Sequence, residues 1–528
     1  MDNLFDRKNY LELLKKRVSS LKDGYRQNIA IVGDEFVGKT SIIYKFLSQY
    51  YDTRTVILYL DIRLESVASF TKRFIAVLLY NFLANSDTAL KEDLDFLILR
   101  SEKYIPKTIE RVRAILNAAA KRKKNNILTE LLSLCDTINQ ETGKSCVVIF
   151  DEFHNLELLG IKGIYREWSK LLISQKNTMY IITSSAKYRT KEILSKELAL
   201  LFGNFELVTV EPFDIKTSKE YLTEKIGSLN LDPGLFDFII HFTGGFPLYL
   251  KIITETLIKS PKTGLTEILE NLLFDASGIL NQRFSNYIKR FTDLPKHNDY
   301  LSTLYLIASG KNKIKEIAHI LKKPIKLINQ KVARLLELDT ITRNGDFLKI
   351  NDRVFAFWLR FVYQEKIHSL TFDTKDKQQK FMNNIKEAIQ EFLTNSQKSV
   401  IERIEELLRL FEDDTIQIER KKLRLNHFRE IKPLEFNRGC LKTGLLGRSA
   451  ESLWIMGYKF DSLTEEDVSE FSKECKKYHH KLQRKIIFTL NEIDSNTRLK
   501  ALEEKVLAWD INHINSMLDL YSKPWLIK

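Results

Sequence analysis

The stretch Asn28–Ile43, NIAIVGDEFVGKTSII, decides the fold of this 528-residue chain. The part before Gly33 is a short apolar run of strand type, and the part after Lys39 has helical spacing. Between them, GDEFVGKT fits the phosphate-binding pattern G-x-x-x-x-G-K-[ST]. The stretch therefore predicts a strand, a loop that surrounds phosphate oxygens and a helix whose positive end points at the same oxygens.

Each fixed position of this loop has a physical task. Gly33 and Gly38 let backbone N–H groups turn inward around the phosphates. Lys39 is expected to reach the β- and γ-phosphates, and the Thr40 hydroxyl to take a coordination position on Mg²⁺.

A partner carboxylate is expected at the end of a second strand. Cys146–Phe150 is a continuous apolar run, typical of a strand buried on both faces, and it ends in Asp151 and Glu152. We expect Asp151 to orient the metal and Glu152 to polarise a water for attack on the γ-phosphate. DEFH also matches the DExH helicase box, so a helicase stays an alternative, although we find no other helicase motif.

Further strands complete the predicted sheet. Thr178–Tyr188 ends in Ser184 and Ser185, and Ser184 is expected to hydrogen-bond the γ-phosphate or the attacking water, with a plain strand-ending turn as the alternative. The segments TRTVILYLDIR and Phe205–Phe213 add two more strands. Alternating strands and helices predict an α/β fold, a parallel sheet with helices on both faces.

These motifs, in this order, resemble the archaeal-type ATPases of the AAA+ and STAND-related P-loop class. That class often has an F-x-x-R opening near the adenine, and the chain has Phe5-Asp6-Arg7, one residue shorter. VEPF follows the last strand, and TGGFPLYL supplies Gly244, Gly245 and Pro247 of a GGxP helix start. The resemblance covers roughly residues 1–365.

The resemblance implies ATP and Mg²⁺ as cofactors. The nucleotide contacts that it implies are Arg7, Gly33, Val37, Gly38, Lys39, Thr40, Ser41 and Pro247. It implies Thr40 and Asp151 as metal-binding residues, and the catalytic residues that we expect are Lys39, Glu152 and Ser184.

The chain departs from the class at its arginines. It has Glu35-Phe36 where the loop often carries two arginines, and Gly203-Asn204 where a Gly-Arg pair is usual. Arg166, Arg189 or a neighbouring molecule would have to supply an arginine finger, which is worth about 10³-fold in rate. The sequence therefore favours nucleotide binding over fast turnover.

A winged helix is expected after the ATPase core. Residues 301–308, 314–321 and 324–338 have helical patterns, and DTITRNGDFLKI predicts a hairpin that turns at Asn344-Gly345. Three helices and a hairpin are typical of a module that binds double-stranded DNA, although in this class the module often packs on the core as a lid. The candidate DNA contacts are Lys322, Lys323, Lys326, Gln330, Lys331, Arg334 and Arg343.

The C-terminal region resembles the PD-(D/E)xK nuclease-like domain. Its E-x-K position is Gly457-Tyr458-Lys459, which lacks the acid, and Glu435 and Glu451 are the nearest acids before it. Two acids are needed to hold the metal, so we expect a degenerate domain that does not cleave and contacts nucleic acid or a protein partner. The adjacent pair His479-His480 is expected on the surface.

Five segments follow from these patterns. They are a P-loop ATPase core at 1–215, a helical lid at 216–290, a winged helix at 291–365, a helical connector at 366–398 and the nuclease-like domain at 399–528.

Composition bounds the partners. Lys and Arg number 83 against 69 Asp and Glu, a balance of +14 that suits either a polyanion partner or a lysine-rich solubilising surface. The cysteines do not form a C-x-x-C pair, no apolar run reaches the ~18 residues that span a bilayer, and the N-terminus does not have the pattern of a signal peptide. We therefore expect a cytoplasmic protein without a membrane partner. We expect an ATP-binding protein, a slow Mg²⁺-dependent ATPase that acts as a switch. The alternatives are a DNA-binding regulator that uses nucleotide structurally and, less favoured, a helicase or nuclease component.

Overall fold

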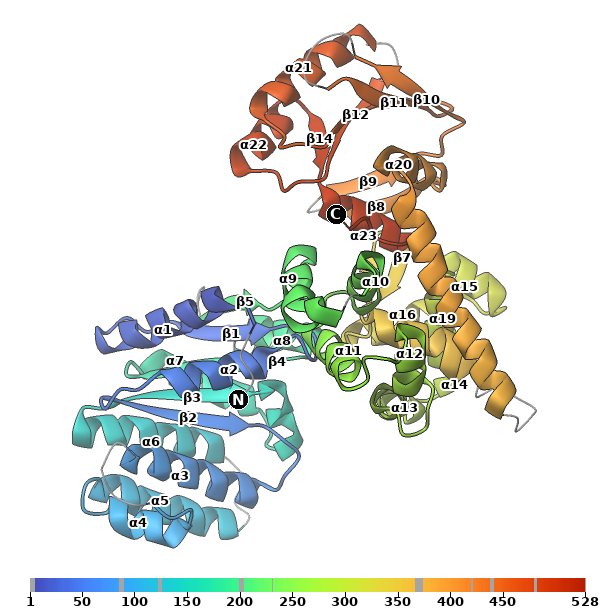
Figure 1. Ribbon diagram of the computed structural model, residues 1–528. Helices are drawn as coiled ribbons and strands as arrows, with labels where there is room; N and C mark the ends of the chain where they lie inside the picture. The colour runs from blue at the N-terminus through green and yellow to red at the C-terminus, as the bar shows by residue number, and fades with distance from the viewer. Residues whose placement is uncertain are drawn as a thin grey trace. The chain divides into compact units, whose positions relative to one another are not determined.

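A computed structural model describes residues 5–84, 90–121, 126–198, 204–229, 231–365, 374–418, 421–436, 441–478 and 482–527. The chain divides into two compact units. The first comprises Met1–Thr217 with Phe246–Leu248, and the second comprises Ser218–Gly245 with Tyr249–Lys528. In Figure 1 the colour of the chain runs from blue at the N-terminus to red at the C-terminus.

A five-stranded parallel sheet forms the centre of the first unit. Its strands are β1 (Asn28–Val32), β2 (Thr55–Asp61), β3 (Ser145–Asp151), β4 (Thr178–Ser184) and β5 (Phe205–Thr209). The order across the sheet is β2-β3-β4-β1-β5, and every pairing is parallel. This arrangement confirms the predicted α/β fold. It also brings the carboxyl ends of β1, β3 and β4 to one edge, where ligands of such sheets bind.

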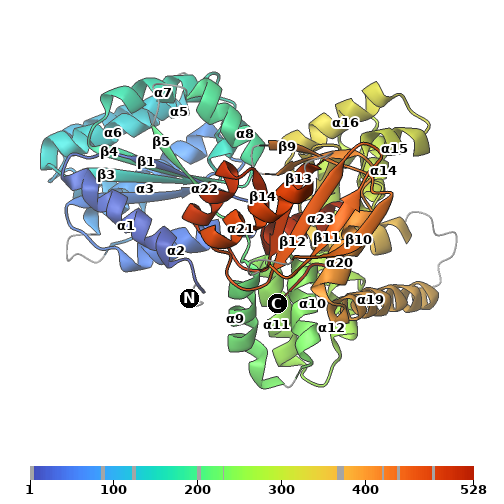
Figure 2. The ribbon, with the colours of Figure 1, turned by 90° about the horizontal axis from the view of Figure 1, so that it is seen from above.

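Helices cover the sheet on both faces. The helices of this unit are α1 (Lys8–Lys22), α2 (Lys39–Gln49), α3 (Val67–Leu83), α4 (Leu94–Ser101), α5 (Pro106–Ala120), α6 (Ile127–Thr142), α7 (Ile164–Ser174) and α8 (Lys187–Glu192), with a 3-10 turn at Phe153–Leu159 and a π turn at Ile193–Glu197. Figure 2 shows α1 and α2 on the opposite side of the sheet from α5, α6 and α7.

The main core lies on the side of α3, α5, α6 and α7. Even-numbered strand residues, such as Phe150 and Tyr180, point into it because side chains alternate along a strand. Trp168 of α7 is fully buried and packs edge-on against both rings, at centroid distances of 5.7 and 5.1 Å. Strand β3 is buried from Cys146 to Asp151, as the apolar run predicts.

The second unit begins with a helical region. Its helices are α9 (Ile215–Ile226), α10 (Pro233–Thr243), α11 (Pro247–Lys259), α12 (Leu265–Leu273) and α13 (Ile279–Thr292), with a 3-10 turn at Gly227–Leu229. A 24-residue helix, α19 (Thr374–Gln397), packs on α10 and α12. Its Phe381 stacks on Phe274 and its Phe392 meets Phe238.

Residues 297–350 form what we call the helix–hairpin segment. It contains α14 (His297–Ala308), α15 (Ile314–Ile320), α16 (Ile325–Glu337), β6 (Ile341–Asn344) and β7 (Phe347–Ile350), followed by α17 (Arg353–Trp358) and a π turn at Leu359–Tyr363. These elements confirm the three predicted helices and the hairpin at Asn344-Gly345. Their assignment as a winged helix remains a prediction.

The C-terminal region contains a second, mixed sheet. Its elements are α20 (Val400–Arg409), β8 (Asp414–Ile418), β9 (Lys421–Leu425), β10 (Glu430–Glu435), β11 (Thr443–Arg448), β12 (Leu453–Lys459), α21 (Glu465–Cys475), a 3-10 turn (Lys476–Tyr478), β13 (Leu482–Thr489), α22 (Ser495–Glu503), β14 (Val506–Trp509) and α23 (Ile511–Leu520). Strands β10, β11 and β12 are antiparallel, and α21 and α22 cross over to the parallel strands β13 and β14. The separate pair β8–β9 is a hairpin.

The tip of the β6–β7 hairpin, Asn344–Asp346, is bonded to β8; we call it the wing turn. The Asp346 N–H donates to the Thr415 carbonyl at 2.8 Å, and the Thr415 N–H donates to the Asp346 carboxylate at 2.7 Å. Asn344 exchanges two further bonds with the backbone of Gln417, at 2.6 and 3.0 Å. Phe347 lies in the apolar core of the C-terminal region. The hairpin and the C-terminal region therefore share one packed interface.

A buried acid, Asp519, forms a second connection between the C-terminal region and the chain around β7. Asp519 of α23 forms ion pairs with Lys349 and Arg353 and accepts a hydrogen bond from the Trp525 indole at 2.8 Å. The backbone N–H of Trp525 in turn donates to His241 Nδ1 of α10 at 3.2 Å. The C-terminal tail is thus held by α10 and by the segment that follows β7.

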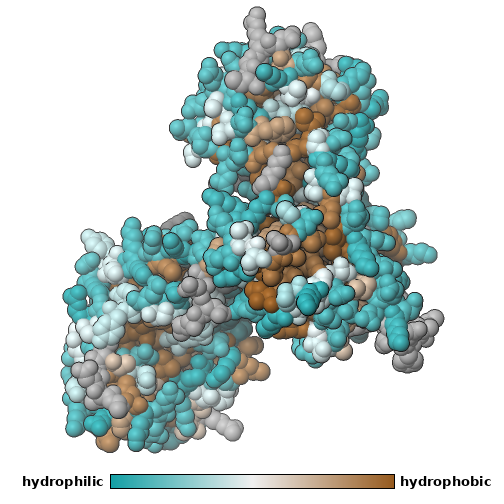
Figure 3. Space-filling model, viewed as in Figure 1, coloured by the Kyte–Doolittle hydropathy of each residue, from teal (hydrophilic) through white to brown (hydrophobic). Residues whose placement is uncertain are grey.

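Hydrophilic side chains cover much of the visible surface of each unit in Figure 3. Among the helices that the structure describes, none is both long and apolar enough to span a bilayer.

Candidate functional site

The phosphate-binding loop joins β1 to α2. Its backbone has positive φ angles at Phe36 (67°) and Gly38 (98°), and glycine adopts such angles without strain. Gly33 is needed for another reason, because a Cβ there would lie 2.2 Å from the Val210 carbonyl oxygen. Val37 is fully buried and anchors the loop. The loop therefore has the turn that its sequence pattern predicts.

Lys39 begins α2 and is almost completely buried, with 4% of its surface exposed. Its Nζ donates to the carbonyls of Gly33 at 3.0 Å and Asp34 at 2.9 Å, and it lies 3.9 Å from Glu152 Oε1. Burial lowers the pKa of the Lys39 ammonium, while Glu152 and Asp151 raise it in part. A buried cation thus faces the two acids at the end of β3.

Asp151 is the last residue of β3 and accepts hydrogen bonds from three hydroxyls. Thr40 Oγ1 and the Tyr59 phenol donate to Oδ2, at 2.9 and 2.8 Å, and the Thr183 hydroxyl donates to Oδ1. A buried carboxylate beside the loop hydroxyl is an all-oxygen donor pair, and Mg²⁺ prefers oxygen ligands and often takes only one or two from protein. Asp151 and Thr40 therefore form an oxygen pair that fits a divalent cation.

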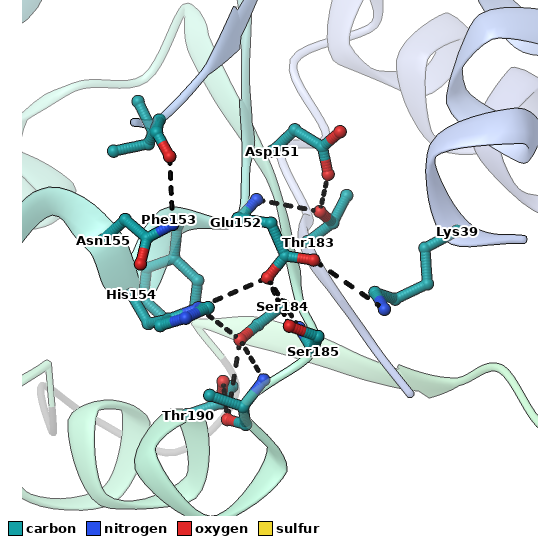
Figure 4. Close-up of polar contacts among 12 residues, drawn as sticks. Lys39, Asp151, Glu152, Phe153, His154, Asn155, Thr183, Ser184, Ser185 and Thr190 are labelled. Carbon is teal, nitrogen blue, oxygen red and sulfur yellow. Dashed lines mark hydrogen bonds and ion pairs between the residues drawn. The ribbon is translucent and has the colours of Figure 1, made fainter. Parts of the chain in front are cut away.

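Glu152 follows β3 in the left-handed region, with φ 53° and ψ 48°. Its Oε2 accepts hydrogen bonds from both the N–H and the hydroxyl of Ser185, each at 2.8 Å. Its own N–H donates to Thr183 Oγ1 at 3.1 Å. Figure 4 shows the Glu152 side chain between Lys39 on one side and His154 and Ser185 on the other. The carboxylate is thus fixed from β4 and faces the loop lysine.

Ser184 reaches this cluster indirectly. Its hydroxyl lies 2.9 Å from His154 Nδ1, and His154 Nδ1 lies 3.4 Å from Glu152 Oε2. Burial lowers the pKa of the His154 imidazole, with the nearby Glu152 raising it in part. The serine that contacts Glu152 is Ser185, the neighbour of the one that we predicted to be catalytic.

Four residues of the cluster were not predicted to act there: Tyr59, His154, Thr183 and Ser185. His154 stands in the DEFH box and Ser185 in the serine pair, so both were visible as sequence signals. Tyr59 and Thr183 lie inside apolar strands, and only the register between strands brings them to Asp151.

Arg7 lies beside the loop. Its guanidinium donates to the Glu211 carbonyl at 2.6 Å and to the Val37 carbonyl at 3.4 Å, and it stacks over the Phe213 ring at 4.8 Å. The N-terminal segment is thereby tied to the loop and to the chain after β5. Nucleotide contacts of Arg7, of the exposed Ser41 and of Pro247, which begins α11, stay predictions.

The arginine candidates differ in their surroundings. Arg189 hydrogen-bonds to three acids, Glu157, Glu192 and Glu197, while Arg166 is exposed on α7. Asn204 precedes β5, and Gly203 lies outside the described residues. Arg189 is therefore fully engaged in a surface ion-pair network.

The candidate DNA contacts on and near α16 differ in what they already contact. Lys323 pairs with Asp299, Arg334 pairs with Glu337, and Lys331 is buried over the Tyr300 ring at 4.0 Å. Arg343 is exposed beside the wing turn and donates to the Gly345 carbonyl at 2.9 Å. Lys322, Lys326 and Gln330 are exposed, and they form no ion pair within the described residues. These three are the members of the predicted set that remain open to a ligand.

The E-x-K position lies at the end of β12. Lys459 Nζ is 3.5 Å from Asp467, an acid that also caps α21. A Cβ on Gly457 would lie 2.5 Å from the Leu441 side chain and 3.0 Å from the Phe471 ring. The position of the missing acid is therefore packed with apolar side chains. His479 and His480 lie outside the described residues.

Comparison with known proteins agrees with the geometry of the first unit. Residues 4–253 match the family described as an ATPase domain predominantly from Archaea. This part of the chain is thus similar to archaeal ATPase domains.

Comparison with solved structures found similar chains. The Walker-type ATPase of Pyrococcus abyssi is 21% identical with a TM-score of 0.50, over 68% of this chain and 96% of that one. The ORC1 protein of Aeropyrum pernix in complex with DNA is 13% identical with a TM-score of 0.35, over 68% and 93% of the two chains. The ORC2 protein of the same organism is 11% identical with a TM-score of 0.38, over 74% and 95%. The search of curated proteins found no match.

Proposed function

We propose that the chain binds Mg²⁺·ATP through its ATPase domain and hydrolyses it slowly, as a nucleotide-controlled switch. One observation carries the proposal: Lys39 and Thr40 at the start of α2 face Asp151 and Glu152 at the end of β3. Positive and negative groups thus meet where the phosphate-binding loop opens. This is the arrangement that phosphoryl transfer to water requires.

Each side chain has a task in this proposal. Lys39 and the loop N–H groups would neutralise the β- and γ-phosphates. Thr40 and Asp151 would hold Mg²⁺, and the bound ion would supply positive charge to those phosphates. Glu152 accepts the proton of the attacking water, and the two donors of Ser185 keep its carboxylate in place. Arg189 is committed to acids, which supports slow turnover without a partner.

The test is steady-state ATP turnover of the full chain, with and without duplex DNA. Lys39→Ala serves as the blank and should lose nucleotide affinity, whereas Lys45→Ala on the same helix should match the wild type. Glu152→Gln should keep nucleotide affinity and lose turnover. Retained affinity in Lys39→Ala would refute the site, and equal turnover in Glu152→Gln would refute the role of Glu152.

A second candidate is a DNA-binding regulator that uses nucleotide structurally. It is favoured by three exposed side chains that would meet phosphates of double-stranded DNA: Lys326 and Gln330 on α16, and Lys322 just before it. Each lysine-to-alanine change at 322 and 326 should weaken duplex binding and reduce the salt slope by about one. An unchanged salt dependence in the double variant would exclude α16 as the contact.

The nuclease alternative has less support. Gly457 occupies the acid position, and neighbouring side chains fill the space that a glutamate would need. We therefore propose that the C-terminal region does not cleave DNA and instead contacts a protein or nucleic-acid partner. Divalent-metal-dependent cleavage that is lost in Lys459→Ala would contradict this.

A further inference from the structure

Tyr59 reaches the end of the neighbouring strand. It lies on β2, where Tyr59 is in register with Ile149 and Asp61 with Asp151. Residues two apart share a face of a strand, so the Tyr59 side chain and Asp151 lie on the same face of the sheet. The phenol extends along the strand and ends 2.8 Å from Asp151 Oδ2.

The direction of this hydrogen bond is fixed by chemistry. A carboxylate only accepts, so the single phenol proton of Tyr59 goes to Asp151. Tyr44 lies 3.2 Å from the Tyr59 oxygen, and it must then donate to Tyr59.

Tyr44 connects this bond to the phosphate-binding helix. Thr40 and Tyr44 are four residues apart on α2 and so lie on one face of the helix. Both point toward the same carboxylate oxygen, Thr40 directly at 2.9 Å and Tyr44 through Tyr59. The rings of Tyr44 and Tyr59 also pack together, with centroids 5.1 Å apart.

We propose that Tyr59 is a positioning residue for the metal-binding carboxylate. Its hydroxyl holds Asp151 in the rotamer that faces Thr40, so a divalent cation meets two oxygens already in place. Partners that orient a metal ligand typically change metal affinity by 10–100-fold when they are removed. This inference rests on the proposed function, because it takes the cation to be the Mg²⁺ of Mg²⁺·ATP.

The test separates metal affinity from nucleotide affinity. A fluorescent ADP analogue is titrated onto the full chain in EDTA and at a series of Mg²⁺ concentrations. In Tyr59→Phe, the affinity in EDTA should match the wild type, while the Mg²⁺ concentration for half-maximal tightening should rise about tenfold or more. Tyr44→Phe should give a smaller rise, and Tyr25→Phe, at a side chain that is 75% exposed, should give none.

The outcomes are distinct. If the wild type binds the analogue with Mg²⁺ dependence and Tyr59→Phe has the same Mg²⁺ midpoint, the positioning role is wrong and the proposed function stands. If the wild type binds no better than Lys39→Ala, both fail. A lower melting temperature together with weaker binding in EDTA would mark Tyr59 as structural support only, which also overturns the inference. Recovery of tight analogue binding by Tyr59→Phe at a higher Mn²⁺ concentration, with an unchanged melting temperature, would support the positioning role.

Discussion

Two donors of Ser185 meet on one oxygen of Glu152, and they differ in what a mutation can remove. The backbone N–H bond survives any side-chain change, whereas the hydroxyl bond does not. A hydrogen bond to a charged group contributes about 1.5–3 kcal/mol. The Ser185 hydroxyl therefore adds to the strength with which the Glu152 carboxylate is held, and the Ser185 N–H keeps that carboxylate oriented when the hydroxyl is removed.

We expect Ser185→Ala to lower kcat for ATP about tenfold without changing nucleotide affinity, because a loss of roughly 1.4 kcal/mol in positioning corresponds to that factor. Single-turnover hydrolysis and equilibrium binding measure the two effects separately. Ser195→Ala, at an exposed serine on the π turn after α8, is the control. An unchanged rate in Ser185→Ala would show that the N–H bond alone positions Glu152.

Individual site residues could be predicted from the sequence where the signal lies in neighbouring positions of the chain. Lys39 and Thr40 are found from the spacing of one loop, and Asp151 and Glu152 from their place after an apolar strand. Tyr59 and Thr183 could not be found this way, since their contacts with Asp151 depend on strands 92 and 32 residues away being aligned. That Ser185 and not Ser184 contacts Glu152 depends on which way each side chain points at the end of β4. The contact of Ser184 with the γ-phosphate or the attacking water stays a prediction.

Among the elements, the junction of β1 with the chain after β5 controls the loop. Gly33 follows β1 and lies against the Val210 carbonyl, and the Val210 N–H donates to the Val32 carbonyl at 2.8 Å. A side chain at Gly33 cannot be accommodated by a rotamer change, because the obstacle is backbone.

Gly33→Ala should therefore displace the loop from β5, lower the melting temperature of the first unit and weaken nucleotide binding by at least tenfold. Gly264→Ala is the matched control, because a Cβ there has no atom within 4 Å and the φ angle is −67°. Thermal unfolding and analogue binding measure both effects. Wild-type affinity in Gly33→Ala would mean that the loop does not depend on this contact.

The sequence predicted elements well where a pattern is short and strong. The buried run of β3 and the Asn344-Gly345 turn are examples, because each is specified by adjacent residues. The helices α4, α5 and α6 were not assigned, since the chain between β2 and β3 carries no turn signal that separates them as clearly. The packing of α19 on α10 and α12 joins residues more than a hundred positions apart, and periodicity does not report such partners.

On the scale of the whole molecule, Asp519 couples the second unit to pH. Burial by itself would raise the pKa of this carboxyl, but Arg353 and Lys349 outweigh it and lower the pKa to about 2. An unfolded aspartate has a pKa near 3.9. The contribution of Asp519 is therefore complete above about pH 5 and is lost as the pH falls through the folded pKa, with a size of roughly 2–3 kcal/mol.

We expect Asp519→Asn to lower the free energy of unfolding of the second unit by roughly 3 kcal/mol at pH 7, since two cations lose their buried partner. Its stability should also fall less than that of the wild type between pH 4 and pH 2. Urea unfolding followed by tryptophan fluorescence reports both, because Trp525 contacts this carboxylate. Asp461→Asn, at an exposed acid in the same region, should behave like the wild type.

The bonded wing turn has a mechanical consequence. A domain attached at one point can swivel about its linker, but the C-terminal region is attached three times: along the chain from α19 to α20, through the wing turn on β8, and through the tail at His241. Three attachments restrict swivelling more than a single linker does. The helix–hairpin segment and the C-terminal sheet are therefore expected to move together as one body, with the wing turn as one of the places where they are joined.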